Sequence, residues 1–194
     1  MEESILDLKN LLKESCQQLG VDLNSNQIEQ FFKYKNLLLE WNEKMNLTAI
    51  TDDKEIILKH FADSVSLSKG IDLNKKIDVI DVGTGAGFPG VPVKIAFPEI
   101  NITLLDSLNK RINFLNEVVK ELGLENVTCI HSRAEDAGIN NELRENFDVC
   151  ISRAVADLSV LSEYCLPFGK VGGYFISLKG PDVTEELNGG GNAI

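Results

Sequence analysis

Residues 78–90 read Asp78-Val79-Ile80-Asp81-Val82-Gly83-Thr84-Gly85-Ala86-Gly87-Phe88-Pro89-Gly90. A mostly β-branched run ends in an acid and a valine, and four of the eight residues from 83 to 90 are glycine. Glycine lets backbone N–H groups approach a ligand closely, and the helix that follows offers that ligand the positive end of its dipole. Loops of this kind follow the first strand of nucleotide-binding α/β sheets. The segment therefore predicts a strand, a ligand-binding loop and a helix, in that order.

The glycine spacing fits two kinds of nucleotide site. Residues 85–90 match the G-x-G-x-x-G spacing of dinucleotide sites, whereas Asp81-x-Gly83-x-Gly85-x-Gly87 matches the loop typical of S-adenosylmethionine (SAM) methyltransferases. Both kinds of site use an acid at the end of the second strand to bind ribose hydroxyls. Asp106 stands in that place, at the end of an apolar run and 23 residues after Gly83. The local pattern thus predicts a nucleotide-type ligand and leaves its identity open.

Length and composition indicate one domain with a small appendage. The chain has 194 residues, of which 43% are hydrophobic and 25% are charged, as in ordinary globular proteins. No apolar run approaches the roughly 20 residues of a membrane span, and Met1-Glu2-Glu3 does not begin a signal peptide. The four cysteines form no C-x-x-C pair, so we expect free, buried thiols in the strand-like runs around Cys129 and Cys150. A cytoplasmic location is the default expectation.

The net charge of −11 bears on possible partners. Residues 1–76 carry 10 basic and 13 acidic side chains, and residues 77–194 carry 9 and 17. This balance argues against non-specific binding to nucleic acid, because such binding depends on neutralising phosphates. A nucleic-acid site on this chain must therefore be a local basic patch.

The hydrophobic periodicity predicts an N-terminal helical extension, residues 1–70, followed by an alternating α/β unit, residues 71–194. The first helix should stop at Gly20, the second should be capped by Asn24 or Ser25, and a third should run from about Glu55 to Leu67. Strands are expected at 77–82, 101–106, 126–131, 147–152 and 172–178, and helices at 89–97, 109–122, 134–144 and 157–168. This alternation predicts a parallel sheet that binds its ligand at the carboxyl ends of its strands.

Further segments resemble the bacterial 16S rRNA guanine-N7 methyltransferases, also called glucose-inhibited division protein B. The matching segments, in chain order, are Leu38-Leu39-Glu40-Trp41-Asn42, Asn46-Leu47-Thr48-Ala49-Ile50, His60 with Asp63-Ser64, 81–90, Leu104-Leu105-Asp106-Ser107-Leu108-Asn109-Lys110-Arg111, Ser132-Arg133-Ala134-Glu135, Ile151-Ser152-Arg153-Ala154 and Leu178-Lys179-Gly180. The resemblance covers about residues 1–187. It implies a Rossmann-like SAM-dependent methyltransferase fold that continues, in the family, through a C-terminal strand pair for which only 16 residues remain after Leu178.

The resemblance also implies a set of cofactor-binding residues. The glycine loop would pass the methionine part of SAM, Phe88 would pack against the cofactor, and Asp106 would bind the ribose. The full set that it implies is Gly83, Gly85, Gly87, Phe88, Asp106, Ser107, Ala134, Glu135 and Arg153. For Glu135 a helix-start charge, and for Arg153 a structural ion pair, are the alternative interpretations.

Basic residues that follow strands suggest an RNA-binding rim. They are Lys110, Arg111, Arg133, Arg153 and Lys179. Because they all follow strands, they can converge on one edge of the sheet despite the acidic body. His60 and His131 fit hydrogen-bonded packing residues better than catalysts, and Trp41 fits the core better than a base-stacking platform. No residue cluster suggests a metal site.

The chemistry that the resemblance implies requires no general base. Guanine N7 carries a lone pair and no proton, so it can attack the methyl group of a sulfonium directly. The protein would mainly hold the two reactants in line, with Arg153 as the positioning group, and an unpaired base in 16S rRNA or the small subunit would be the acceptor. We expect a monomer. An NAD(P)-dependent oxidoreductase and a non-catalytic module that binds SAM or a nucleotide are the competing interpretations.

Overall fold

The computed structural model describes residues 4–153 and 157–179. Five parallel strands form one sheet in the order β3-β2-β1-β4-β5. The strands are β1 (Asp78–Val82), β2 (Asn101–Asp106), β3 (Val127–His131), β4 (Phe147–Arg153) and β5 (Gly169–Leu178). The order reverses direction between β1 and β4, which is the place where open parallel sheets bind ligands.

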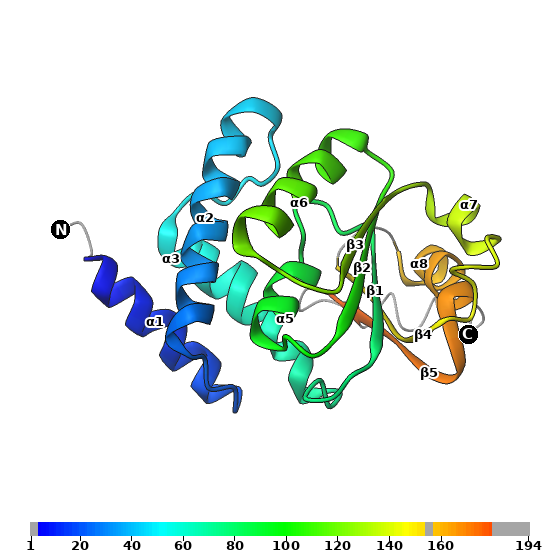
Figure 1. Cartoon of the computed structure of the whole chain (residues 1–194), viewed down its shortest axis with the longest axis horizontal. Coiled ribbons are helices and arrows are strands. Elements are labelled where there is room, and N and C mark those ends of the chain that lie inside the picture. The colour runs from blue at the N-terminus through cyan, green and yellow to red at the C-terminus, as the bar shows by residue number, and fades with distance from the viewer. Residues whose placement is uncertain (1–3, 154–156, 180–194) are drawn as a thin grey trace.

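Helices cover both faces of this sheet (Figure 1). On one face lie α5 (Gly90–Ala96) and α6 (Asn109–Leu122), and on the other lie α7 (Ala134–Gly138) and α8 (Leu158–Cys165) with the 3₁₀ turn η3 (Leu166–Phe168). The alternation of side chains along β1 explains this arrangement: Val79 belongs to the core under α5 and α6, whereas Ile80 and Val82 belong to the core under α8.

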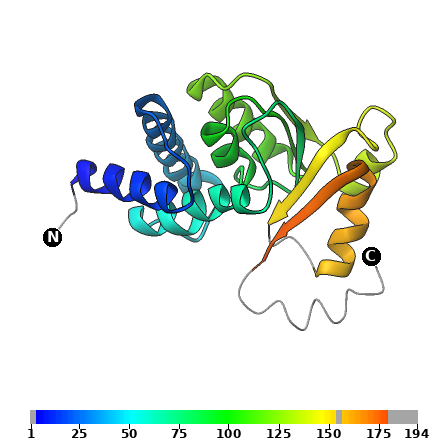
Figure 2. The same ribbon diagram turned by 90° about the horizontal axis from the view of Figure 1, so that it is seen from below.

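The N-terminal segment adds a helical layer outside α5 and α6, as Figure 2 shows from a second direction. It comprises α1 (Ile5–Gln18), α2 (Ser25–Met45), α3 (Asp53–Glu55), the π-helix η1 (Ile56–Ala62), α4 (Asp63–Val65) and the 3₁₀ turn η2 (Ser66–Lys69). Leu12, Phe31 and Phe61 are fully buried in the same core as Val79. The division into an extension of residues 1–70 and a domain of residues 71–194 stays a prediction.

Most of the predicted elements are present, with informative differences at their ends. Asn24 caps α2 through a capping box with Gln27. The helix predicted at 134–144 ends at Gly138, so that prediction was too long, and residues 141–145 form a turn instead. β5 starts at Gly169 rather than at residue 172, because Gly169 already pairs with Phe147 of β4. The expectation of a missing strand pair concerns residues 180–194, which lie outside the described residues.

Two smaller predictions concern side chains. Trp41 is half-buried against Phe114, with ring centroids 5.6 Å apart, which confirms that it packs on the core. The cysteines are free thiols; Cys150 is buried as predicted, whereas Cys129 is half-buried because it lies on the edge strand β3.

Candidate functional site

A cavity of about 630 Å³ opens at the carboxyl edge of the sheet. This volume is in the range of small-molecule and cofactor sites. Ten of the predicted site residues line it: Gly83, Gly85, Phe88, Asp106, Ser107, Arg111, Arg133, Ala134, Glu135 and Arg153. The fold therefore brings together residues that are up to 70 positions apart in the chain.

Three predicted residues do not line the cavity. Gly87 is buried behind the loop, where a Cβ atom would lie 2.7 Å from Val91 Cγ2 and 2.8 Å from the Tyr34 hydroxyl, at a φ of +100°. Close packing against α5 and α2 therefore explains a glycine at this position, and its predicted place beside the cofactor stays a prediction. Lys110 is exposed at the start of α6, and Lys179 is half-buried just after β5.

A buried carboxylate holds the glycine loop in shape. Asp81 is fully buried, and its Oδ2 accepts hydrogen bonds from the Thr84 hydroxyl at 2.7 Å and from the Gly90 N–H at 2.8 Å. Burial raises the pKa of Asp81 to about 6, although these two hydrogen bonds lower it. The Gly90 N–H at the start of α5 is thus bonded to Asp81, and the expectation that this helix offers its positive end to a ligand stays a prediction.

The loop is also fastened from outside the sheet. The hydroxyl of the fully buried Tyr34, on α2, donates a hydrogen bond to the Ala86 carbonyl. Its ring lies 5.5 Å from the ring of Phe88, between centroids. The N-terminal layer thus contacts the loop directly, and the position of Phe88 depends on both parts of the chain.

Asp106, the last residue of β2, is buried and already makes polar contacts. Asp106 Oδ2 accepts a hydrogen bond from the Gly85 N–H and Oδ1 accepts one from the Leu108 N–H, both at 2.9 Å. The Arg111 guanidinium lies 3.4 Å from Oδ2. An ionised carboxylate offers about four acceptor positions, so Oδ1 keeps one, and the long Arg111 contact is the easiest to replace. Arg111 thus contacts Asp106, and its predicted place in the RNA rim stays a prediction.

The segment after β3 supplies the opposite wall. Arg133 and Glu135 are exposed and Ala134 is half-buried, and all three line the cavity. Glu135 lies in the first turn of α7, where the helix dipole stabilises a negative charge. Its position is therefore compatible both with contact to a cofactor and with a purely helix-stabilising charge.

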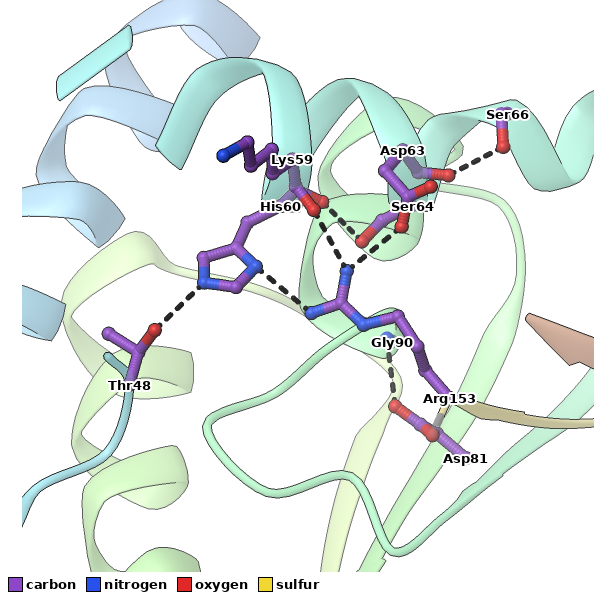
Figure 3. Close-up of polar contacts among 9 residues, drawn as sticks. All are labelled: Thr48, Lys59, His60, Asp63, Ser64, Ser66, Asp81, Gly90 and Arg153. Atoms are coloured by element: carbon purple, nitrogen blue, oxygen red, sulfur yellow. Dashed lines mark hydrogen bonds and ion pairs between the residues drawn. The ribbon is translucent and has the colours of Figure 1, made fainter. Parts of the chain in front are cut away.

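Arg153, at the end of β4, is held by the π-helical turn (Figure 3). Its guanidinium donates to the Asp63 carboxylate at 3.1 Å, to the Lys59 carbonyl at 3.4 Å and to Nδ1 of His60 at 3.2 Å. It also lies 4.8 Å from the centre of the Phe88 ring. Since the side chain is 16% exposed, Arg153 is both an ion-paired residue and a wall of the cavity. The positive charge of Arg153 is therefore compensated within the protein by the Asp63 carboxylate.

His60 and Thr48 are cavity residues that the sequence reasoning did not select. The His60 ring stacks on Phe88, with centroids 4.3 Å apart, and its Nε2 lies 2.9 Å from Thr48 Oγ1. Burial, and then the charge of Arg153, lower the pKa of His60 to about 4. The prediction that His60 is hydrogen-bonded and packed is confirmed, but it also borders the site. The signal was present, since both residues lie in segments that carried the family resemblance.

Within residues 4–153 and 157–179, no group of three or more His, Cys, Asp or Glu side chains could hold a metal ion. No helix in those ranges is long and apolar enough to cross a membrane.

Comparison with known proteins decides the family. A family profile described as rRNA small subunit methyltransferase G matches residues 27–194. The chain belongs to this family. The ribosomal RNA small subunit methyltransferase G of Clostridium perfringens strain 13 is 58% identical over 185 residues, which cover 95% of this chain and 77% of that protein. The protein of the same name from Acetivibrio thermocellus is 55% identical over 194 residues, which cover 100% of this chain and 79% of that protein.

Solved structures agree on the fold. A SAM-dependent methyltransferase from Aquifex aeolicus superposes with a TM-score of 0.54 at 22% identity, over 79% of this chain and 87% of that one. A SAM-dependent O-methyltransferase from Thermotoga maritima gives a TM-score of 0.54 at 19% identity, over 80% and 54% of the two chains. The fold is thus the Rossmann-like fold of SAM-dependent methyltransferases. Membership of a methyltransferase family does not favour the oxidoreductase interpretation.

The lowered pKa of His60 predicts a pH-dependent contribution to stability. The unfolded chain protonates this residue near its ordinary pKa of 6.5, whereas the folded protein does so near 4. The stability from the neutral ring is therefore fully present above about pH 6.5 and is lost as the pH falls toward 4. We expect His60→Gln to lower the unfolding free energy by about 1–3 kcal/mol at pH 7, and by less at pH 4.5.

Urea unfolding of both proteins at several pH values measures this difference. Asp81, whose folded pKa is raised to about 6, gives the opposite slope between about pH 4 and 6. The contribution of Asp81 to the pH dependence of stability is the same in the wild type and in His60→Gln. The difference in unfolding free energy between the two proteins therefore reports on His60 alone. A difference that stays constant from pH 7 to pH 4.5 would contradict a neutral His60.

Proposed function

We propose that this protein transfers a methyl group from SAM to N7 of a guanine in 16S rRNA. The observation that carries the proposal is that one cavity at the carboxyl edge of the sheet is lined by the glycine loop, Asp106 and Arg153 together. Family membership supports the same activity, since the relatives are named as methyltransferases of small-subunit ribosomal RNA.

The residues present fit SAM. Gly85 lies on the cavity wall with a φ of +62°, and a Cβ atom there would meet nothing closer than 4.0 Å, so its surroundings leave room for a ligand. The remaining acceptor position of Asp106 Oδ1 suits a ribose hydroxyl, with Ser107, Ala134 and Glu135 close by. Gly83, Gly85 and Phe88 would hold the methionine part. When bound, SAM supplies an electrophilic methyl group on a sulfonium.

The side chains at the acceptor end of the cavity match such a transfer. Guanine N7 has no proton to lose, so the chain needs no residue to remove one. His60 is neutral at physiological pH, and Asp63 compensates the charge of Arg153. His60 and Arg153 therefore place no uncompensated positive charge beside a cationic cofactor. Arg153, Phe88 and His60 form a packed wall that orients the reactants, and orientation can contribute about 7–11 kcal/mol to lowering the barrier.

For the RNA we propose a rim formed by Lys110, Arg133 and Lys179. Lys110 and Arg133 are exposed, and all three follow strands on the ligand edge. Arg111 and Arg153 are paired with Asp106 and Asp63, so we assign them to the cavity rather than to phosphate. The partner is 16S rRNA or the small subunit. A monomeric state and a cytoplasmic location stay predictions.

Asp106→Ala tests the cofactor site. Loss of the ribose contacts and of the Gly85 contact should weaken SAM binding by about 2–4 kcal/mol, a roughly 30- to 1,000-fold higher Kd by calorimetry. Asp136→Ala is the matched control, because Asp136 is an exposed acid of α7 outside the cavity lining. An unchanged Kd in a folded Asp106→Ala protein would remove Asp106 from the site. Tighter binding of NAD than of SAM would favour the oxidoreductase.

Methyl transfer tests the reaction itself. We expect SAM-dependent methylation of bare 16S rRNA, small subunits or both, with the methyl mapped by mass spectrometry to N7 of a guanine. The rate should be flat between about pH 7 and 8.5, since no base titrates in the step. A methyl on a carbon, a ribose or an adenine contradicts the proposal. SAM binding without transfer to any of these RNAs favours the non-catalytic module.

Salt dependence of RNA binding tests the rim. Each contact to phosphate that is lost should lower the slope of log K against log salt by about one unit, so we expect this for Lys110→Ala, Arg133→Ala and Lys179→Ala. Arg144→Ala is the control, because Arg144 lies beside Glu145 outside the cavity. Arg153→Ala should leave the slope near that of the wild type. If the three rim variants all keep the full slope, RNA binds elsewhere.

A further inference from the structure

A polar chain connects the end of β4 with the segment that follows α2 (Figure 3). Asp63 binds Arg153, Arg153 binds Nδ1 of His60, and Nε2 of His60 binds the hydroxyl oxygen of Thr48. Three of its members, Thr48, His60 and Arg153, line the cavity. The direction of each hydrogen bond in the chain can be deduced from its chemistry.

The deduction starts at Arg153. A guanidinium has N–H donors and no acceptor, so His60 Nδ1 must accept the bond at 3.2 Å. The ring is neutral at physiological pH, so its proton resides on Nε2. Nε2–H therefore donates to Thr48 Oγ1 at 2.9 Å. Arg153 thus determines the tautomer of His60.

Thr48 must then donate in a further direction. A hydroxyl has two lone pairs and one hydrogen. One lone pair accepts from His60 and the other accepts from the Ile50 N–H at 3.0 Å. Within residues 4–153 and 157–179 no acceptor is found for the hydroxyl hydrogen, and Thr48 is a half-buried residue of the cavity wall. The hydrogen is therefore available to a group in the cavity.

We propose that the Thr48 hydroxyl donates a hydrogen bond to O6 of the target guanine and so selects guanine over adenine. This inference rests on the proposed function. N7 and O6 lie on the same edge of guanine, and N7 uses its lone pair in the new bond to carbon. O6 is then the acceptor on that edge that remains for Thr48. Adenine carries an amino group in place of O6. Because this amino group is a hydrogen-bond donor, it cannot accept the hydrogen of the Thr48 hydroxyl.

His60, Arg153 and Asp63 act through Thr48 as positioning residues. Arg153 fixes the tautomer of His60, so His60 occupies one lone pair of the Thr48 hydroxyl and the Ile50 N–H occupies the other. The threonine therefore cannot turn its oxygen toward an amino group without breaking these two hydrogen bonds. A site with a directed donor rejects a base that lacks the matching acceptor more strongly than an apolar wall does.

The test compares Thr48→Val with the wild type on two RNAs. After the target nucleotide has been mapped with wild-type protein, RNA is prepared with guanosine or with 2-aminopurine riboside at that position. The analogue keeps N7 and lacks O6. For the wild type we expect kcat/KM to fall about five- to tenfold from guanosine to the analogue, as for loss of one neutral hydrogen bond. Thr48→Val should show a similar fall on guanosine and no further fall on the analogue.

Control variants separate this contact from a structural effect. Thr48→Ser keeps the hydroxyl and should retain activity on guanosine. Ser66→Ala removes a hydroxyl that bonds the Asp63 carbonyl outside the cavity lining, and should retain both activity and selectivity. SAM affinity should be unchanged in all three variants.

Each outcome decides the matter. Full activity of Thr48→Val on guanosine overturns the inference, as does an equal loss on both RNAs, which indicates a structural role. Wild-type protein that places no methyl on a guanine overturns the proposed function, and this inference with it. Wild-type activity on guanosine together with any of the contrary Thr48 results overturns the inference alone.

Discussion

The buried carboxylate of Asp81 is the constraint on which the site depends. One of its oxygens holds the Thr84 hydroxyl and the Gly90 N–H, which are six residues apart, so the loop between them must curve around it. A side chain at Gly90 would collide with this oxygen and with Leu104, which explains a glycine there on packing grounds. The curvature directs the Gly85 N–H toward Asp106 and thereby links the first two strands at their carboxyl ends.

The N-terminal layer completes the cavity rather than merely covering the sheet. Tyr34 fastens the glycine loop, and η1 supplies the groups that surround Arg153. π-helical turns frequently occur at functional sites, and this one carries His60 and the Lys59 carbonyl to the end of β4. Both halves of the chain therefore build the cavity, since Thr48 and His60 come from the N-terminal layer and the glycine loop and Asp106 come from the sheet.

Electrostatics divide the basic residues into two groups with different roles. Those paired with carboxylates, Arg111 and Arg153, shape the cavity. Arg133 is exposed and lines the cavity, which suits the proposed contact with RNA. On a chain with a net charge of −11, the proposed RNA rim must attract a polyanion through such local basic groups.

Local sequence determined the strand order along the chain, the glycine loop and the acid at Asp106, because these depend on short-range periodicity and backbone freedom. It could not determine the end of the helix at 134–144 or the start of β5, since pairing with β4 decides the latter. It could not show the contacts of Thr48 and His60 either. His60 meets Arg153 across 93 residues, and its tautomer follows from that contact. A hydrogen-bond direction set by partners distant in the chain exists only once the tertiary structure has brought them together.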